Sequence, residues 1–181
     1  MLVGTLLGDA HIRRNKDGTS FVTFEQALAK ESYLVHLYEL VTAQGLSMNS
    51  PIQYNRADPR YSGKINSSLY FRTISHICFN ELADLFLDGS NKVISTNIAE
   101  HLDIVALAYW ICDDGQTVKR GGVTLCTDSF TAFEIQLLRD ALMSNFGLST
   151  SLHRQGKRIY IGKSGLMKLQ LQLSQHVHTS H

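Results

Sequence analysis

The spacing of apolar and polar residues along this chain predicts helices alternating with pairs of strands. In segment 30–44, Leu34, Leu37 and Val41 recur every three to four residues, which places them on one face of a helix. In segment 67–73, apolar and polar residues alternate, as in a sheet with one buried face. The elements expected in chain order are helix 2–9, strands 10–16 and 20–27, helix 30–44, strands 51–56 and 67–73, helix 76–87, helix 101–113, strands 116–120 and 123–127, helix 129–146, strands 149–154 and 158–162, and a last helix from about 164.

Turn and capping residues mark where these elements end. Asn15-Lys16-Asp17-Gly18 is typical of a hairpin turn. Gly45 is expected to end one helix, and Asp128 is expected to cap the start of another. Each half of the chain then has the order αββαββα, which predicts an α+β fold. The predicted organisation is a first repeat at 1–87, a polar linker at 88–100 and a second repeat at 101–181.

Strand alternation also assigns a direction to individual side chains. The apolar set expected to face the helices is Ile52, Leu69, Phe71, Val123, Leu125, Ile159 and Ile161. The polar set expected to face outward is Gln53, Asn55, Tyr70, Arg72, Thr124, Arg158 and Tyr160. Each antiparallel sheet would therefore have one polar face.

Short blocks of sequence recur in the same order in both halves. Residues 2–10 resemble residues 107–115, and the later matches follow in order: Val22-Thr23-Phe24 with Val123-Thr124-Leu125, Gly45-Leu46-Ser47 with Gly147-Leu148-Ser149, and Leu69-Tyr70-Phe71 with Ile159-Tyr160-Ile161. The alternative is coincidence among apolar strand residues that are common in all folds. Because four blocks keep their order, an internal repeat is the better explanation.

The first block carries an acidic residue at the same place in both copies. Overlaying 2–10 on 107–115 aligns Asp9 with Asp114, each at the end of a short apolar helix and beside a small residue. Either acid alone would be typical of an exposed helix end. As a pair, packed helices could bring them together, and paired carboxylates hold hard divalent metals for phosphate chemistry.

Composition excludes several classes of protein. The 181 residues are 18% charged with a net charge of +1, which does not indicate disorder. There is no secretory signal and no apolar run long enough to span a bilayer, so a membrane protein is not expected. Cys78, Cys112 and Cys126 lack metal-site spacing and are expected to be buried thiols in a reducing compartment.

Local charge differs from the small net charge. The strand regions 10–27, 51–73, 115–127 and 149–163 hold 13 of the 17 Lys and Arg residues but only three of the 16 acids. The alternative is the ordinary mixed charge of solvated strands. A basic layer backed by acidic helices favours a phosphate-backbone ligand.

The outward strand residues also include types that recognise bases. Gln, Asn and Arg can pair with base edges in the major groove, which admits a two-stranded ribbon. The candidate DNA-contacting residues are Arg13, Arg14, Lys16, Thr23, Glu25, Gln53, Asn55, Arg56, Lys64, Tyr70, Arg72, Gln116, Lys119, Arg120, Thr124, Arg154, Lys157, Arg158, Tyr160 and Lys163.

These motifs resemble those of a known family. Leu2–Ala10 and Leu107–Gly115 are similar to the two signature helices of the LAGLIDADG homing endonucleases, in their single-chain, two-repeat form. Asn80-Glu81-Leu82-Ala83-Asp84-Leu85-Phe86 and Thr127-Asp128-Ser129-Phe130 add to the resemblance, which covers nearly the whole chain. It implies two αββαββα halves about a pseudo-twofold axis, with saddle-shaped sheets on DNA and the signature helices at the centre.

The resemblance also implies roles for individual residues. Asp9 and Asp114 would bind Mg²⁺ near the scissile phosphates, with Mn²⁺ or Ca²⁺ as substitutes, helped by Gly8 and Asp113. Lys92 matches the lysine that the family places near the first active site. No residue of this sequence matches the lysine of the second active site, which leaves the completeness of that site open.

Three functions follow from this interpretation. The first is a monomeric, site-specific endonuclease that cuts a long, non-palindromic stretch of double-stranded DNA by metal-dependent hydrolysis. The second is a maturase that binds intron RNA, and the third is a DNA-binding regulator that does not cut. Retention of both Asp9 and Asp114 favours cleavage. The expected location is intracellular, in a mitochondrion or chloroplast or in a prokaryotic cytoplasm.

Overall fold

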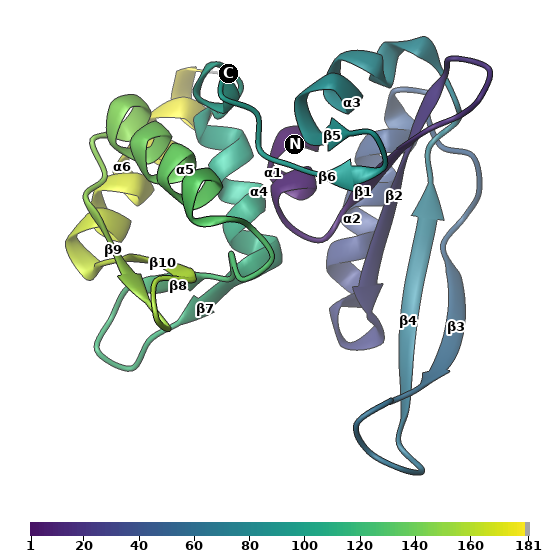
Figure 1. Cartoon of the computed structure of the whole chain (residues 1–181), viewed down its shortest axis with the longest axis horizontal. Coiled ribbons are helices and arrows are strands. Elements are labelled where there is room, and N and C mark those ends of the chain that lie inside the picture. Colours follow the sequence, from purple (N-terminus) through teal and green to yellow (C-terminus); the bar gives the residue numbers. More distant parts are fainter. Residues whose placement is uncertain (180–181) are drawn as a thin grey trace. The chain divides into compact units, whose positions relative to one another are not determined.

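The structure is a computed structural model that describes residues 1–179. These residues form two compact units. The 9–84 unit contains Asp9–Asp84, and the split unit joins Met1–Gly8 to the chain from Leu85 onward. Figure 1 labels the elements of both units, and helix α3 (Asn80–Phe86) carries the chain from the first to the second.

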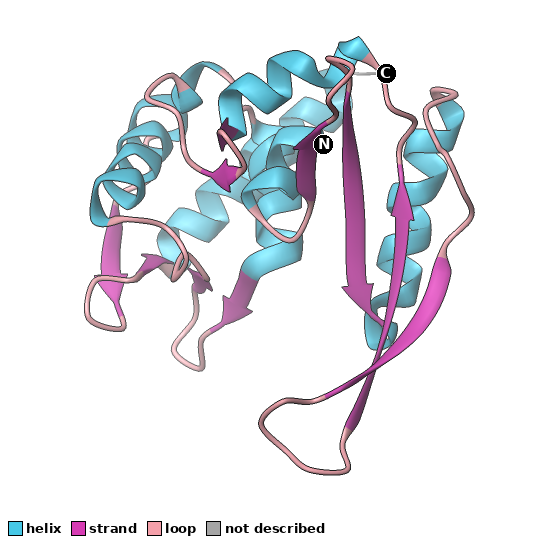
Figure 2. Ribbon diagram, turned by 45° about the vertical axis from the view of Figure 1, so that its right-hand side comes forward, coloured by secondary structure: helices cyan, strands magenta, loops and turns pink. Residues whose placement is uncertain are grey.

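The 9–84 unit is a four-stranded antiparallel sheet covered on one face by a helix. Its strands are β1 (His11–Arg14), β2 (Ser20–Ala27), β3 (Ile52–Ala57) and β4 (Ile65–Arg72), in the spatial order β1-β2-β4-β3, and its covering helix is α2 (Glu31–Ala43). Figure 2 shows α2 running along one face of the long strands. Between sheet and helix, the Phe24 and Phe71 rings stack with centroids 4.7 Å apart, and Tyr38 of α2 meets Phe71 edge-on. These aromatic contacts fix which face of the sheet is buried.

Strand pairing fixes the opposite face of this sheet. Thr23 lies opposite both His11 and Arg72, while Glu25 lies opposite Tyr70. Residues opposite one another in antiparallel strands project from the same face. These five side chains therefore share the face that α2 does not cover, called here the open face.

One predicted direction in this sheet is wrong. Alternation placed Ile52 toward the helices, but Ile52 pairs with Tyr70 and is 45% exposed. Gln53 correspondingly lies opposite the buried Leu69, and Asn55 lies opposite Ser67. The phase of β3 is set by its hydrogen bonds to β4, and a single apolar residue at its start did not reveal that register.

The split unit has the same architecture with shorter strands. Its sheet elements are β7 (Gly115–Thr117), β8 (Val123–Leu125), β9 (Thr150–His153) and β10 (Arg158–Ile161), in the order β7-β8-β10-β9. Its helices are α1 (Leu2–Leu7), α4 (Ile104–Asp114), α5 (Ala132–Phe146) and α6 (Lys163–Thr179), and a small hairpin pairs β5 (Leu87–Asp88) with β6 (Asn91–Lys92). The same sheet order in both units confirms the predicted α+β fold with two αββαββα halves.

Helices α1 and α4 pack so closely that only glycine fits at their contact. A Cβ atom on Gly4 would lie 2.1 Å from the backbone oxygen of Ala106. A Cβ atom on Gly8 would lie 2.4 Å from the Cβ of Asp113. Both helices also carry large apolar residues that are almost completely buried: Leu6 and Leu7 in α1, and Trp110 in α4. The predicted pairing of the two signature helices is therefore confirmed within the split unit.

The start of α5 corrects a second prediction. Asp128 does not cap this helix, because Thr131 is the N-cap: its side chain accepts a hydrogen bond from the Glu134 amide. Glu134 returns the bond by accepting from the Thr131 amide, which completes a capping box. Asp128 instead forms an ion pair with Arg158.

Residues 88–100, the predicted linker, contain β6 and a 3₁₀ turn at Ile98–Glu100, and their role as a linker between the repeats stays a prediction. One further expectation needs correction. The cysteines are free thiols as expected, but Cys78 and Cys112 are exposed and Cys126 is half-buried. Among the helices of residues 1–179, none has the length and hydropathy needed to cross a bilayer.

Candidate functional site

The end of α1 brings a backbone carbonyl, a lysine and an aspartate together. Lys92 Nζ donates a hydrogen bond to the Gly8 carbonyl oxygen over 3.1 Å. The Asp113 side chain is buried, and a Cβ on Gly8 would lie 2.5 Å from its Oδ2 atom. Glycine at position 8 therefore lets the Asp113 side chain lie against the turn that precedes Asp9, and Lys92 bonds to the carbonyl of the same residue.

Lys92 is held on an ordered segment. It lies in β6 opposite Leu87, and the Val93 amide donates to the Phe86 carbonyl. The next amide, that of Ile94, donates to Glu134 Oε2 over 2.5 Å. The capping glutamate of α5 thus also fixes the strand that carries the lysine.

Asp9 has a partner that the sequence interpretation missed. Gln26 Nε2 donates a hydrogen bond to Asp9 Oδ2 over 3.0 Å, and Gln26 is buried. In β2, Gln26 lies on the same buried face of the sheet as Val22 and Phe24. The alternation of β2 predicts an apolar residue at position 26. A glutamine there could have indicated a functional contact, since a buried amide needs a hydrogen-bond partner.

Asp114 ends α4, and its backbone carbonyl accepts from the Cys126 amide over 3.3 Å next to β8. Asp9 belongs to the 9–84 unit and Asp114 to the split unit, so the closeness of their carboxylates stays a prediction. The available donors are carboxylate and carbonyl oxygens, which suit a hard ion such as Mg²⁺. Within residues 1–179, no cluster of three or more His, Cys, Asp or Glu side chains could hold a metal.

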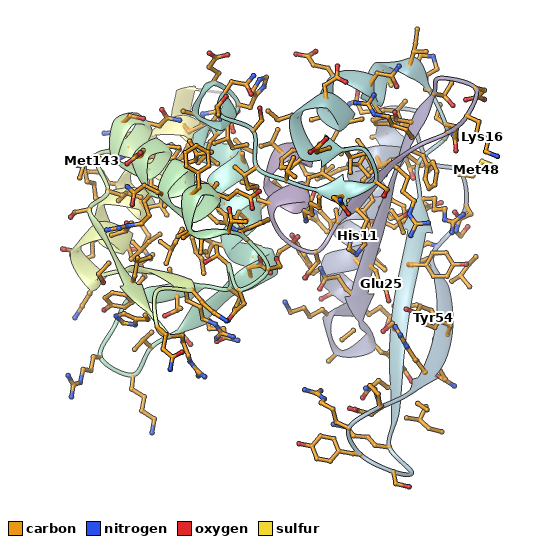
Figure 3. All side chains as sticks on the ribbon, in the orientation of Figure 1. His11, Lys16, Glu25, Met48, Tyr54 and Met143 are labelled. Carbon is orange, nitrogen blue, oxygen red and sulfur yellow. The ribbon has the colours of Figure 1, made fainter. Side chains whose placement is uncertain are left out.

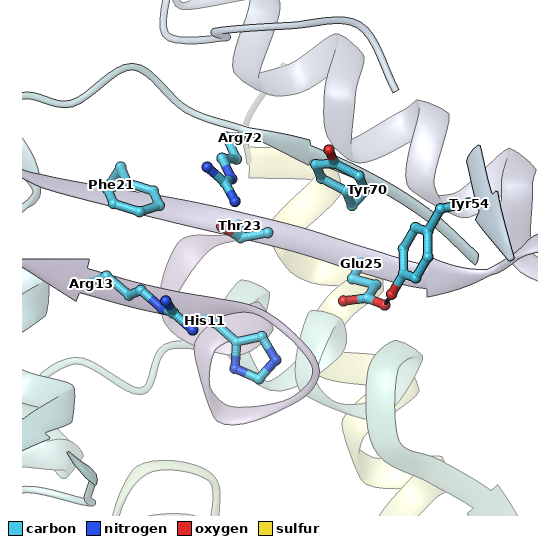
Figure 4. A pocket seen from close by; sticks show the side chains of 8 residues that line it. All are labelled: His11, Arg13, Phe21, Thr23, Glu25, Tyr54, Tyr70 and Arg72. Atoms are coloured by element: carbon cyan, nitrogen blue, oxygen red, sulfur yellow. Dashed lines mark hydrogen bonds between the residues drawn. The ribbon is translucent and has the colours of Figure 1, made fainter. Parts of the chain in front are cut away.

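The open face of the 9–84 unit is hollowed above its strands. The hollow has a volume of about 410 Å³. Figure 4 shows the side chains that line it, contributed by all four strands: His11, Arg13, Phe21, Thr23, Glu25, Tyr54, Tyr70 and Arg72. Aromatic rings, hydrogen-bond donors and one carboxylate therefore face the same space.

Arg72 is oriented in this hollow by aromatic rings. Its guanidinium carbon lies 5.5 Å from the centroid of the Phe21 ring and 6.0 Å from that of Tyr70. Cations are attracted to such ring faces. Arg72 is exposed, so its guanidinium lies between ring contacts and solvent.

Glu25 is also oriented, by a hydrogen bond. The Tyr54 hydroxyl donates to Glu25 Oε1, and the Tyr54 ring meets Tyr70 edge-on at 5.8 Å. The bond to the Glu25 carboxylate raises the pKa of Tyr54 above its ordinary value, because the carboxylate accepts the proton that ionisation would remove. Figure 3 labels Glu25 and Tyr54 on this face, together with Lys16 in the β1–β2 turn.

A buried aspartate organises the tip of the β3–β4 hairpin. Asp58 accepts from the Arg60 amide over 2.9 Å and from Asn66 Nδ2 over 3.1 Å. Lys64 Nζ lies 3.8 Å from its Oδ2 atom, and both Arg60 and Lys64 flank the exposed Tyr61 ring. The hydrogen bond from the Arg60 amide is the main reason that the pKa of Asp58 is lowered. This tip presents an aromatic ring between two cations.

On the outward face of the split unit, an arginine bonds to neighbouring polar side chains, unlike Arg72 on the open face of the 9–84 unit. Its hollow of about 270 Å³ is lined partly by Lys119, Thr124 and Arg154. Arg158 Nε lies 2.8 Å from Asp128 Oδ2, and Arg158 donates to Gln116 Oε1 over 3.0 Å. Polar groups here bind one another.

The other candidate DNA-contacting residues have varied positions. Arg14 forms an ion pair with Asp84 and lies opposite the buried Ser20. Tyr160 stacks on His153 and donates its hydroxyl to the Gly121 carbonyl. Exposed residues in or near turns, or on an edge strand, are Lys16, Arg56, Lys64, Lys119, Arg120, Arg154, Lys157 and Lys163. Contact of any of these residues with DNA stays a prediction.

Comparison with known proteins identifies relatives over most of the chain. It is 31% identical over 157 residues to the cytochrome b mRNA maturase bI2 of Debaryomyces hansenii, which covers 86% of this chain and 59% of that protein. The protein of the same name from Saccharomyces cerevisiae is 27% identical over 179 residues, covering 92% and 42%. The probable intron-encoded endonuclease 1 of Wickerhamomyces canadensis is 25% identical over 158 residues, covering 83% and 66%. The chain thus spans about half the length of the two maturases.

Solved structures share the fold. The homing endonuclease I-WcaI bound to its DNA recognition sequence matches with a TM-score of 0.79 and 23% identity, covering 93% of this chain and 76% of that chain. A variant of the homing endonuclease I-DmoI, in complex with its target DNA in the presence of manganese, matches with a TM-score of 0.54 and 14% identity, covering 92% and 87%. Residues 1–169 match the family model described as the LAGLIDADG DNA endonuclease family. This protein therefore belongs to the LAGLIDADG DNA endonuclease family, as its two signature motifs predicted.

Proposed function

We propose that this protein is a site-specific endonuclease of the homing type that hydrolyses both strands of a long, non-palindromic DNA target. The observation that carries the proposal is the cluster at the end of α1, where Lys92 and Asp113 both reach Gly8, directly before Asp9. Its context is the family membership and the DNA-bound relatives of the same fold. One chain carries both repeats, which supports a monomer that reads a different half-site with each.

Oxygen donors of the signature helices would hold the metal. Asp9 and Asp114 would supply carboxylates, and Gly8 and Asp113 would supply backbone carbonyls. Mg²⁺ is bound in other proteins by one or two carboxylates together with substrate phosphates, so this donor set fits it. When bound, a divalent ion would neutralise charge on the scissile phosphate and make water more acidic. Mn²⁺ and Ca²⁺ are the substitutes to compare, and the structure of the I-DmoI variant with its target DNA was obtained in the presence of manganese.

The surrounding side chains would position these donors. Gln26 holds one oxygen of Asp9 and thereby fixes the rotation of its carboxylate. Lys92 keeps a positive charge beside the Gly8 carbonyl, where it would favour the approach of a phosphate. Both are supported by paired strands, which is what a site needs if its groups are to be ordered before substrate binds.

The test is a cleavage assay on duplex DNA that contains the uninterrupted sequence of the host gene. With Mg²⁺, the wild-type protein should cut both strands, and a chelator should stop it. Asp9→Asn and Asp114→Asn should each abolish cleavage and leave DNA binding largely intact, because the acids repel phosphate when no metal is bound. Asp88→Asn, an exposed acid in β5, is the matched control and should cut normally. No cleavage with any divalent ion, despite specific binding, would refute the proposal.

The relatives named mRNA maturases favour one alternative, which is that the chain binds intron RNA and assists splicing. A splicing assay with the host intron distinguishes it, since assistance should persist in Asp9→Asn and Asp114→Asn if it is independent of cleavage. Binding without cleavage or splicing would favour a DNA-binding regulator. The proposed site of action is the intracellular compartment that holds the host gene.

A further inference from the structure

Glu25 is an acidic residue where the proposed ligand is strongly negative. It lines the hollow of the open face together with Arg13 and Arg72, and no other carboxylate lines that hollow within residues 1–179. A carboxylate facing a phosphate backbone weakens non-specific binding, which depends on cations. Its presence therefore needs an explanation other than general affinity.

The structure holds this carboxylate in one place. Glu25 lies opposite Tyr70 in the β2–β4 pairing, and Tyr54 donates its hydroxyl to Oε1 from β3. Tyr54 is in turn packed edge-on against Tyr70. Because the tyrosine bond engages Oε1, the second oxygen, Oε2, can accept from a group that enters the hollow. An oriented acceptor at the centre of a sheet face is suited to reading one base.

We propose that Glu25 is a specificity-determining residue that selects a base with an exocyclic amino group in the major groove, either N4 of cytosine or N6 of adenine. The proposal rests on the proposed DNA-binding function and names the chemistry that one position of the target must offer. A carboxylate accepts from these amino groups. The corresponding edges of guanine and thymine present O6 and O4, which are acceptors and would repel it.

In the same hollow, Arg72 would favour a base that presents hydrogen-bond acceptors, whereas Glu25 would favour one that presents donors. Its guanidinium can donate to guanine O6 and N7, and its aromatic contacts orient it for that role. Neighbouring donor and acceptor side chains thus distinguish bases by attraction at one atom and repulsion at another. Tyr54 acts here as a positioning residue, since it would contact Glu25 and not the base.

The competing explanation is that Glu25 only anchors Tyr54 within the sheet. Selection of binding sites from a random duplex library, in chelator so that no DNA is cut, separates the two. The wild-type profile should contain a position fixed as cytosine or adenine, and that position alone should become indifferent in Glu25→Ala. The base that is enriched tells which of the two amino groups is read.

A second measurement removes only the amino group from that base, by placing 2-pyrimidinone for cytosine or purine for adenine. Wild-type affinity should fall by about tenfold, as for the loss of one good base contact. The affinity of Glu25→Ala should not change. Tyr54→Phe, which retains the ring and loses the hydroxyl, should show a smaller fall than wild type. Glu39→Ala removes an exposed carboxylate from α2, on the covered face, and should behave as wild type.

The outcomes separate the two proposals. If wild-type protein enriches no sequence at all, the proposed function fails and this inference fails with it. If it enriches a defined site but Glu25→Ala keeps the same base preference and the same response to amino removal, only the inference is overturned. Thermal melting of each variant shows whether the sheet is intact, so that a loss of folding is not mistaken for a loss of reading.

Discussion

The two four-stranded sheets share one topology but differ in length. In the 9–84 unit, β2 and β4 each have eight residues. In the split unit, the corresponding strands β8 and β10 have three and four residues. Every second residue of a strand faces outward. Although the two sheets have the same topology, the longer sheet therefore has about twice as many outward-facing side chains with which to contact a ligand.

The two outward faces also differ in whether an arginine has hydrogen-bond donors available for a ligand. Arg72 is held by aromatic rings, which leave its hydrogen-bond donors available. Arg158 uses its donors on Asp128 and Gln116 and is only 19% exposed in its side chain. We expect the 9–84 unit to contribute more to base discrimination, and the split unit to contribute more through exposed lysines in its turns.

The largest expected effect is a loss of stability in the split unit alone, caused by a substitution in α1. Gly4→Ala should destabilise the split unit by about 1–3 kcal/mol, the usual cost of overpacking. The gain of about 1 kcal/mol in helix propensity should not compensate, because the new Cβ would meet the Ala106 backbone oxygen at 2.1 Å. Hydrogen exchange should show lost protection in β8 and β10 before β2 and β4.

Gly162→Ala is the matched control, since its Cβ would have no heavy atom closer than 3.9 Å outside its own chain neighbours. It should leave exchange in both sheets nearly unchanged. If Gly4→Ala instead loosened the two sheets equally, the division into two units of separate stability would be wrong.

The next effect compares the two arginines directly. Arg72→Ala should weaken binding to the preferred DNA site by about 1–3 kcal/mol and relax one base preference. Arg158→Ala should lose less than about 1 kcal/mol, because its donors already bind protein groups. Affinities of both variants for matched and single-mismatch duplexes measure the difference. Equal losses would mean that Arg158 leaves Asp128 on binding, and the comparison would have to be abandoned.

The smallest expected effect is a shift in titration. Tyr54 has a raised pKa because of its bond to Glu25, so Glu25→Gln should lower the Tyr54 pKa toward the ordinary tyrosine value of about 10. A raised folded-state pKa stabilises the fold fully below the unfolded pKa, and this contribution is lost as pH rises through the folded pKa. Ultraviolet absorbance of tyrosinate against pH checks the shift, and Glu39→Gln should leave it unchanged.

Much of this fold was predictable from local patterns, and the exceptions have identifiable causes. Periodicity gave the element order because the helix and strand periods differ strongly. The capping of α5 was misassigned although Thr131 and Glu134 have capping-box spacing, which is a stronger signal than Asp128 alone. The outward position of Ile52 depends on pairing with β4, which no local pattern encodes.

The candidate site was predictable to a similar extent. The repeat singled out Asp9 and Asp114, and the family resemblance added Lys92, whose bond to Gly8 places it beside the first motif. Gln26 was missed because its role depends on a turn that returns β2 to Asp9. Contacts made across a strand pairing require the register, and the register is a property of the assembled sheet.

The membership of α1 in the split unit has a consequence for the order of folding during synthesis. Asp9–Asp84 is continuous in sequence, so this unit can form once it has left the ribosome. Helix α1 is synthesised before this unit, yet its partner α4 begins only at Ile104. Helix α1 must therefore wait for α4 while the whole first sheet is made, with its apolar residues not yet packed against that partner. High contact order of this kind slows folding, and here it falls on the segment that leads into Asp9, the first of the two proposed metal-binding aspartates.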